Sequence, residues 1–355
     1  MTCCKRLQIF RNHRMMWRKW SDGMVATLKH VALLAGVSTS AVSRAFTKGA
    51  SVSPTMRSKV ELAAAQLGYS PNFLASSLTT GRTKLIGLVS NNFHNPVFLE
   101  VFDLFTRALQ DRGLRPLLVN LSEETDPEAS MRMLRQYSVD GVVVASSTLP
   151  PGFAEGFARA GVPVVHSFGR NSAAPMVNVV GVDNVAAGRM AGRELIARGY
   201  SRVGFLGGPK GASSTEDRLA GFQGAVARHK DAVLSISYAS AYSFEAGRSE
   251  MQRLLLEDPA EAYFCGDDVL SIGALSALAD AGLSVPGDVG IIGFNDMEMA
   301  GWANIGLTTV HQPVAKIIAT SVDLVVALID APQTEPAVRL FPCHVVSRRT
   351  LRDRI

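Results

Sequence analysis

The segment STSAVSRAF (38–46) concentrates side chains that can contact nucleic acid. Thr39, Ser40 and Ser43 supply small hydroxyls, and Arg44 supplies the only charge. Hydroxyls near the start of a helix can bond phosphates or base edges, and arginine can bond the O6 and N7 atoms of guanine together. The alternative is a generic helical unit whose polar face is simply hydrated. The segment alone leaves both interpretations open.

Three short helices are predicted around this segment. Each follows a residue whose hydroxyl can cap it. They are residues 28–35 after Thr27, residues 39–46 after Ser38, and a third helix that starts at Ser53-Pro54. Gly36 and Gly68 end the first and third helices, because glycine tolerates a positive φ. Three helices with a tight turn between the first two predict a helix-turn-helix unit over residues 27–70.

Charge is distributed unevenly along the 355 residues, of which 47% are apolar and 19% charged. Residues 1–23 hold six Lys or Arg and one acid, and residues 24–84 hold seven against Glu61 alone. The remainder holds 23 basic and 29 acidic residues. A basic front on a mildly acidic body predicts that only the front meets a polyanion.

Two further segments flank the helical unit. Residues 1–26 show no clean period, and we expect a disordered basic extension; a nucleic-acid arm, a targeting peptide and sequence upstream of a start at Met24 are the alternatives. Residues 71–84 hold a short apolar run that is too short to be a stable helix alone in water. Leu78 ends this run, where a side chain could wedge into a base step. An ordinary linker is the alternative.

From residue 85 to residue 355, apolar runs alternate with helical segments of roughly ten to sixteen residues. The strand-like runs are 85–90, 115–120, 141–146, 162–167, 177–182, 202–207, 261–266 and 289–294. This alternation predicts parallel sheets covered on both faces. Because the segment is large for one open sheet, we expect an α/β body of two doubly wound lobes with a cleft between them.

Motifs of enzymes are missing from the sequence. GFLGGPKG (204–211) is glycine-rich but fits neither the dinucleotide-binding pattern nor a P-loop, and no G-x-S-x-G or H-E-x-x-H occurs. The scattered cysteines are interpreted as reduced thiols, with neither disulfides nor a zinc site; they are Cys3, Cys4, Cys265 and Cys343. We therefore expect no enzymatic activity, no cofactor and no metal, and no run is long enough for a membrane helix.

Six side chains near predicted strand ends form a candidate binding set. They are Phe98, Arg218, Tyr242, Asp267, Asn295 and Gln312. Carboxyl ends of parallel strands meet at one edge of a sheet, so these side chains are expected to converge on the cleft. An arginine, amides, a carboxylate and aromatic faces suit a polyhydroxylated ligand. Each residue alone could instead be a core aromatic, a helix cap or a turn residue.

Three stretches in register resemble the lac repressor family of bacterial regulators. They are TLKHVALLAGVSTSAVSRAF (27–46), VSPTMRSKVELAAAQLGYSPN (52–72) and LTTGRTKLIGLV (78–89), and the likeness extends to about residue 350. The resemblance implies that Thr39, Ser40 and Arg44 read bases in the major groove while Ser43 lies close to the backbone. It also implies that Leu78 and its dimer mate open a central base step from the minor groove.

The resemblance further implies a periplasmic-binding-protein-like body in which the six strand-end residues contact an effector. One departure affects that expectation. The strand-end motif usually read A-N-D is Gly266-Asp267-Asp268 here, and the usual F-D-D is Phe294-Asn295-Asp296. Amide and carboxylate have exchanged places, so we expect the pocket to keep its net charge but to hold its ligand through a different donor–acceptor pattern.

The sequence therefore predicts a ligand-responsive, cytoplasmic DNA-binding repressor without a membrane partner. We expect it to grip a near-palindromic operator as a homodimer and to respond to a small metabolite, a sugar or sugar derivative. A tetramer stays open, although the C-terminus, SRRTLRDRI, has no heptad repeat. The alternative is a small-molecule-binding protein of the periplasmic type, which would share the body but would need a signal peptide and no basic front.

Overall fold

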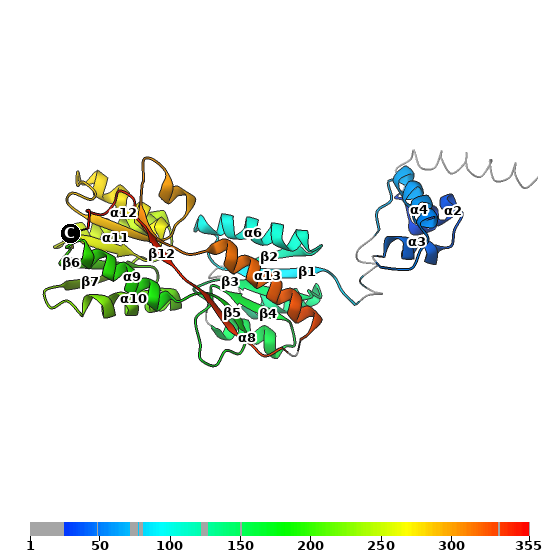
Figure 1. Ribbon diagram of the computed structural model, residues 1–355, viewed down its shortest axis with the longest axis horizontal. Helices are drawn as coiled ribbons and strands as arrows, with labels where there is room; N and C mark the ends of the chain where they lie inside the picture. Colours follow the sequence, from blue (N-terminus) through cyan, green and yellow to red (C-terminus); the bar gives the residue numbers. More distant parts are fainter. Residues whose placement is uncertain are drawn as a thin grey trace, which may run out of the picture. The chain divides into compact units, whose positions relative to one another are not determined.

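The computed structural model describes residues 25–47, 49–71, 77, 81–121, 127–149, 151–332 and 334–354 (Figure 1). The chain divides into two compact units, Met1–Thr83 and Lys84–Ile355. Within the described residues, no helix is both long enough and apolar enough to cross a membrane.

The first unit contains a three-helix cluster, which we call the headpiece. Its helices are α2 (Leu28–Ala35), α3 (Thr39–Phe46) and α4 (Pro54–Leu67), as the sequence predicted. Val31, Val42 and Val60, one from each helix, are fully buried against one another. Caps set the turns: Ser38 Oγ accepts a hydrogen bond from the Ala41 N–H at 3.2 Å, and Gly36 adopts a φ of 67°.

The second unit, the body, contains two six-stranded sheets, so the prediction of two lobes is confirmed. The N-lobe sheet has the order β11-β5-β4-β3-β1-β2, and every pair in it is parallel. Its strands are β1 (Leu85–Ser90), β2 (Arg115–Asn120), β3 (Gly141–Ala145), β4 (Val164–Ser167), β5 (Asn178–Val182) and β11 (Val338–Phe341).

The C-lobe sheet has the order β12-β10-β9-β8-β6-β7, in which only the β10–β12 pair is antiparallel. Its strands are β6 (Arg202–Gly207), β7 (Val233–Tyr238), β8 (Ala262–Cys265), β9 (Gly290–Asn295), β10 (Thr308–His311) and β12 (His344–Val346). The sequence analysis did not find β7, β10, β11 and β12. These strands are short or lie near a sheet edge, so they lack the long apolar run that marks a central strand.

Helices cover both faces of each sheet (Figure 1). On the N-lobe, α6 (Val97–Asp111) and α13 (Val314–Asp330) pack on one face, and α7 (Pro127–Gln136) and α8 (Pro151–Arg159) pack on the other. On the C-lobe, the two pairs are α9 (Asn184–Ala197) with α10 (Ser213–Val226), and α11 (Phe244–Leu255) with α12 (Asp268–Asp280); a 3-10 helix, η1 (Glu298–Gly301), follows β9.

The chain passes between the two sheets three times. It leaves the N-lobe sheet after β5, returns after β10, and crosses again between β11 and β12. Both sheets therefore turn their central parallel strands toward a shared cleft, with the carboxyl ends of the strands at its walls.

The helix pair α9–α10 packs at a distance that only glycine permits. A Cβ on Gly221 would lie 1.9 Å from the Val185 carbonyl oxygen, and one on Gly188 would lie 2.0 Å from the Arg218 carbonyl oxygen. Both obstacles are backbone atoms, so they cannot swing aside. The pair holds the start of α10, and with it Arg218, in a fixed place on the C-lobe.

Alanine at position 221 is expected to lower the free energy of unfolding by about 1–3 kcal/mol, because the added methyl forces the two helices apart. Gly224 on the same helix is the matched control, since a Cβ at this position would have nothing within 4 Å. Gly224→Ala should instead be neutral or stabilise by up to about 1 kcal/mol, the ordinary helix preference. Urea denaturation measures the free energy of unfolding of both variants. Equal effects of the two substitutions would contradict the close contact between α9 and α10.

Candidate functional site

The headpiece presents the four predicted DNA-contacting side chains on one surface of α3. Thr39, Ser40, Ser43 and Arg44 are all exposed, while Ala41, Val42 and Ala45 on the same helix are buried. The hydrophobic spacing therefore fixes which side of α3 faces solvent. The fifth predicted DNA contact, Leu78, lies outside the described residues.

Arg57 of α4 is a residue that the sequence analysis missed. Its Nη1 donates to the carbonyl oxygen of Ala45, in the last turn of α3. A cation there satisfies an unpaired helix carbonyl and opposes the negative end of the helix dipole. Arg57 thus fastens the end of α3 to α4. The sequence gave no signal for this contact, because an arginine in a basic segment could equally contact a phosphate.

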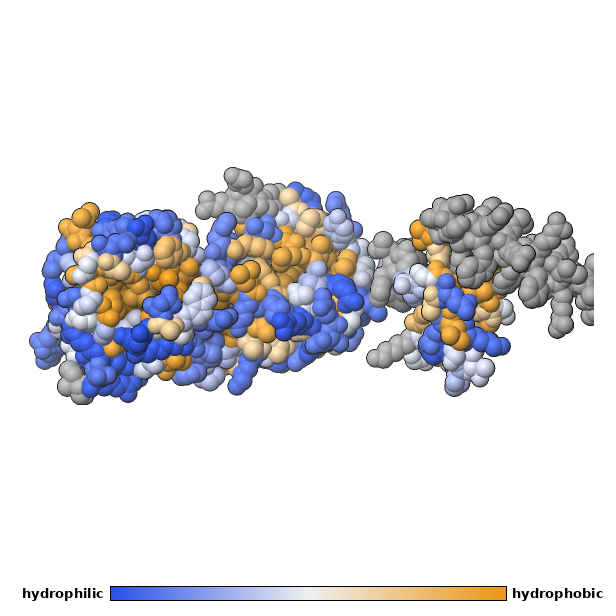
Figure 2. Space-filling view, turned by 90° about the horizontal axis from the view of Figure 1, so that it is seen from above, coloured by the Kyte–Doolittle hydropathy of each residue, from blue (hydrophilic) through white to orange (hydrophobic). Residues whose placement is uncertain are grey.

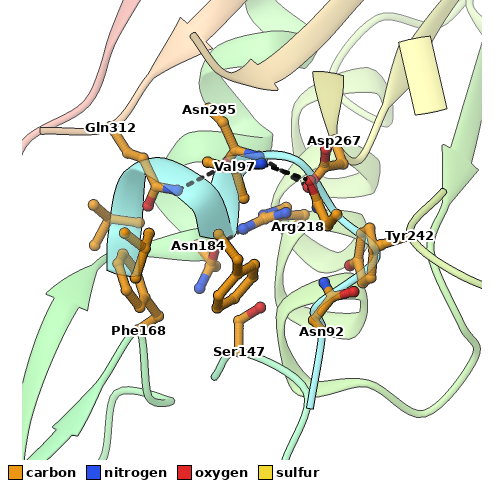
Figure 3. Close-up of a pocket in the computed structure, with 14 residues that line it drawn as sticks. Asn92, Val97, Ser147, Phe168, Asn184, Arg218, Tyr242, Asp267, Asn295 and Gln312 are labelled. Carbon is orange, nitrogen blue, oxygen red and sulfur yellow. Dashed lines mark hydrogen bonds between the residues drawn. The ribbon is translucent and has the colours of Figure 1, made fainter. Parts of the chain in front are cut away.

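The body contains a cavity at the cleft between the lobes, where all six predicted strand-end residues meet (Figure 3). Phe98 comes from the N-lobe, and the other five come from the C-lobe or from the crossing after β10. The cavity has about 520 Å³ of space free of atoms, part of it open to solvent. Eight lining residues were not predicted: Asn92, Asn95, Val97, Val101, Ser147, Phe168, Val182 and Asn184.

Arg218 lies on the cavity wall with 5% of its surface exposed. Its Nε donates to Asn184 Oδ1 at 2.9 Å, and its Nη1 donates to the Gly266 carbonyl oxygen at 2.5 Å. The guanidinium lies 3.6 Å from the centroid of the Phe294 ring, a stacking contact that fixes its plane. Burial lowers the pKa of Arg218, although an arginine stays protonated at neutral pH.

Asp267 caps α12 and collects hydrogen bonds from both lobes. Its Oδ1 accepts from the Val269 N–H at 2.9 Å, while its Oδ2 accepts from Asn95 Nδ2 at 2.9 Å and from Asn295 Nδ2 at 2.8 Å. Gln312 Nε2 donates in turn to Asn295 Oδ1 at 2.6 Å (Figure 3). Burial raises the pKa of Asp267, and these hydrogen bonds oppose that rise. The exchanged amide and carboxylate thus bond to each other.

Tyr242 directs its hydroxyl toward α10. Its OH group lies 2.7 Å from Thr215 Oγ1 and 3.2 Å from Ser214 Oγ, both on α10. The ring packs over Gly208, where a Cβ would lie 2.3 Å from a ring carbon. The glycine-rich segment after β6 therefore makes room for Tyr242, and Tyr242 offers the cavity a ring rather than a polar group.

Three contacts hold the two lobes together around the cavity. Asn95 of the N-lobe donates to Asp267 of the C-lobe, and Ser213 Oγ donates to the Ser147 carbonyl oxygen at 3.1 Å. Arg170 Nη2 lies 2.6 Å from Asp217 Oδ1. These contacts bridge the two lobes beside the cavity, so a wider opening of the cleft requires that they release.

The acidic, histidine and cysteine side chains of the described residues are the groups that could hold a metal ion. No cluster of three or more His, Cys, Asp or Glu side chains placed to hold a metal ion occurs among them. Asp268, beside Asp267, is fully buried: its Oδ1 accepts from Thr309 Oγ1 at 2.5 Å and its Oδ2 from the Met297 N–H at 2.8 Å. These bonds tie α12 to β9 and β10, a structural role.

Comparison with known proteins gives matches for both units. Residues 27–72 match the family described as bacterial regulatory proteins, lacI family, and residues 193–351 match a periplasmic binding protein-like domain. The HTH-type transcriptional repressor PurR of Proteus mirabilis (strain HI4320) is 31% identical over 337 residues, which are 93% of this chain and 98% of that protein. PurR of Escherichia coli O139:H28 (strain E24377A / ETEC) is 32% identical over 338 residues, with the same coverage.

Two solved structures agree over most of the chain. The lac repressor dimer bound to operator and the anti-inducer ONPF has a TM-score of 0.83 at 24% identity, covering 93% of this chain and 100% of that one. The complex of the transcriptional regulator CelR with cellobiose has a TM-score of 0.68 at 29% identity, covering 92% and 99%. The first likeness supports the fold, and the second adds sequence similarity over the same span.

Asn95→Asp is expected to weaken closure of the cleft. The new carboxylate can still accept from the Val97 N–H, as Asn95 Oδ1 does at 3.2 Å, but it faces Asp267 with a like charge. We expect a loss of about 1–3 kcal/mol in the free energy of unfolding and a larger radius of gyration in solution scattering. Adding Asp267→Asn should restore part of both, because the hydrogen bond then forms in the reverse direction; a double variant no better than Asn95→Asp would refute the contact.

Asp268 is expected to make stability depend on pH. Burial raises the pKa of Asp268 to about 7, whereas the unfolded chain releases this proton near the ordinary value of 3.8. Between these values the unfolded state holds fewer protons, so the free energy of unfolding should fall as the pH rises toward about 7. Asp268→Asn should flatten this slope in thermal melts. Asp288→Asn should leave it unchanged, because hydrogen bonds from Ser284 lower the pKa of Asp288.

Proposed function

The chain belongs to the lacI family of bacterial regulatory proteins, and from this we propose that it is a cytoplasmic transcriptional repressor whose affinity for a near-palindromic operator is changed by a small metabolite. The observation that carries the proposal is the exposed surface of α3. It offers three hydroxyls and one arginine to solvent on a helix whose other side is anchored in a core. Thr39, Ser40 and Arg44 read bases, Ser43 lies near the backbone, and Leu78 acts from the minor groove.

The effector binds between the lobes of the body and is a sugar or sugar derivative. Phe98 and Tyr242 offer ring faces to the C–H surfaces of a sugar, while Arg218, Asp267, Asn295 and Gln312 offer polar groups to its hydroxyls. The relative CelR has been solved with cellobiose, a sugar, which supports this class of ligand. Binding alters lobe closure, and the two sites are coupled by a free energy of about 1–3 kcal/mol that acts in both directions.

A homodimer is the working form, since a near-palindromic operator presents two equivalent half-sites. Exposed apolar side chains on the body support self-association: Leu99 of α6 is 74% exposed, Leu118 of the edge strand β2 is 48% exposed, and Trp302 is 47% exposed. Figure 2 shows apolar surface gathered on both lobes of the body. These three side chains are candidates for the dimer interface.

Arg44→Ala should lower the affinity for the operator by about 1–3 kcal/mol and relax the preference at one base pair, because a bidentate contact to a base is lost. Lys59→Ala, which removes an exposed charge from α4, is the control; it should weaken binding about equally on all sequences. Competition binding on an operator library measures both. Equal loss across sequences for Arg44→Ala would make this residue a phosphate contact.

The function itself is tested by fluorescence anisotropy of the full chain on DNA from upstream of its own gene and its neighbours, at several salt concentrations. Tight binding that weakens steeply with salt is expected, since Lys and Arg displace counterions from the phosphates. The same titration with a panel of sugars and sugar acids should find a compound that shifts the affinity. Absence of binding at low salt by a confirmed dimer would instead favour the periplasmic-type binding protein.

A further inference from the structure

Arg218 carries a buried charge that the described part of the chain does not pair with a carboxylate. Its two hydrogen-bond acceptors, Asn184 Oδ1 and the Gly266 carbonyl oxygen, are neutral. Buried charges in proteins are normally met by an opposite charge or a metal. The cost of leaving Arg218 in this state is visible in its pKa, which burial lowers.

The carboxylates nearest to Arg218 are engaged elsewhere. Asp267 receives three N–H groups, from Asn95, Asn295 and the backbone of Val269. Asp217 pairs with Arg170 at 2.6 Å. Both act on Arg218 only through space.

Two further groups that act on Arg218 through space are Tyr242 and Cys343. Tyr242 is a phenol whose hydroxyl is hydrogen-bonded to α10. Burial raises the pKa of the Cys343 thiol to about 11, so it stays protonated. Within the described residues, the cavity therefore contains one cation whose direct partner must come from outside the chain.

The geometry leaves one part of the guanidinium available. Phe294 covers a face of the group at 3.6 Å, while Nε and Nη1 are taken by Asn184 and Gly266. No acceptor for Nη2 is found in the part of the chain that the structure describes. Figure 3 shows Arg218 reaching between Asn184 and Asp267 into the space that the other side chains surround.

We propose that the ligand of this cavity is a hydroxylated carboxylic acid of sugar size, a sugar acid, whose carboxylate pairs with Arg218. This deepens the proposed function and rests on it. A planar carboxylate matches the open edge of a planar guanidinium. A monoanion adds one negative charge to a lining that holds Arg218 and the Asp267 carboxylate, whereas a phosphate dianion would add two.

The rest of the lining suits the remainder of such a molecule. The amides of Asn92, Asn184 and Gln312 can bond hydroxyls as donors or acceptors. Phe98 and Phe168 also line the cavity and offer apolar rings against which the C–H groups of a sugar can pack. Asp267 can accept one further hydrogen bond from a ligand hydroxyl, since its two oxygens already accept three.

Matched pairs of compounds test the proposal in isothermal titration calorimetry of the full-length protein. D-gluconate is compared with D-glucitol, D-glucuronate with D-glucose, and D-galacturonate with D-galactose; each neutral partner has the same carbon skeleton, and the same open or ring form, without the acid. At least one acid should bind with a Kd about thirtyfold or more below that of its neutral counterpart. A neutral sugar that binds as tightly as its acid, or no binding by any acid at millimolar concentration, overturns the proposal.

Variants identify the partner of the carboxylate. Arg218→Gln should remove the preference for the acid, and Arg218→Lys, which keeps the charge without the planar fork, should retain part of it. Arg193→Gln on the exposed surface of α9 removes the same charge away from the cavity and should leave the preference intact. An unchanged preference in a folded Arg218→Gln protein overturns the assignment; if that variant does not fold, the comparison of acids with neutral sugars on the wild-type protein still decides.

Operator binding separates this proposal from the function on which it rests. Anisotropy that shows operator binding together with calorimetry that shows no acid binding refutes the ligand class and leaves the repressor intact. Acid binding by a protein that binds no DNA supports the ligand class and refutes the repressor.

Discussion

The constraint on which the body depends is that its chain passes between the two sheets three times. Three crossings link the lobes covalently, and two of them supply residues that line the cavity: Val182 and Asn184 flank the first, and Gln312 lies on the second. A change in the angle between the lobes therefore changes the spacing of the lining residues.

The cleft holds two opposite charges, those of Asp267 and Arg218, which do not form a direct ion pair with each other. Asp267 is held by amide and backbone N–H groups from both lobes, and Arg218 by neutral oxygens and an aromatic ring. The Gln312–Asn295–Asp267 chain of hydrogen bonds explains why an asparagine ends β9 and an aspartate lies just after β8. The carboxylate closes the cleft, and the guanidinium remains for a ligand.

Much of this could be predicted from the sequence, because local chemistry determines it. Ser38 and Gly36 mark the ends of headpiece helices through caps that need no tertiary context, and the carboxyl ends of parallel strands converge wherever such a sheet forms. Asp267 and Asn295 could be named for that reason, although Tyr242 and Gln312 follow strands, β7 and β10, that were not predicted. Asn95 and Ser147 could not, since they sit in N-lobe loops and matter only after the lobes close. Arg57 was missed because its acceptor is a backbone carbonyl on another helix.

The glycine contact between α9 and α10 has a consequence for redesign. Because Gly188 and Gly221 lock the scaffold of the C-lobe through backbone atoms, rigidity does not depend on most side chains that line the cavity. Asn92, Ser147 and Gln312 can therefore be substituted in a library that is screened for a new ligand preference, while the C-lobe backbone stays unchanged. Such a chain suits the design of a biosensor, in which the body is redesigned to bind a new ligand and the headpiece gives the response through DNA binding.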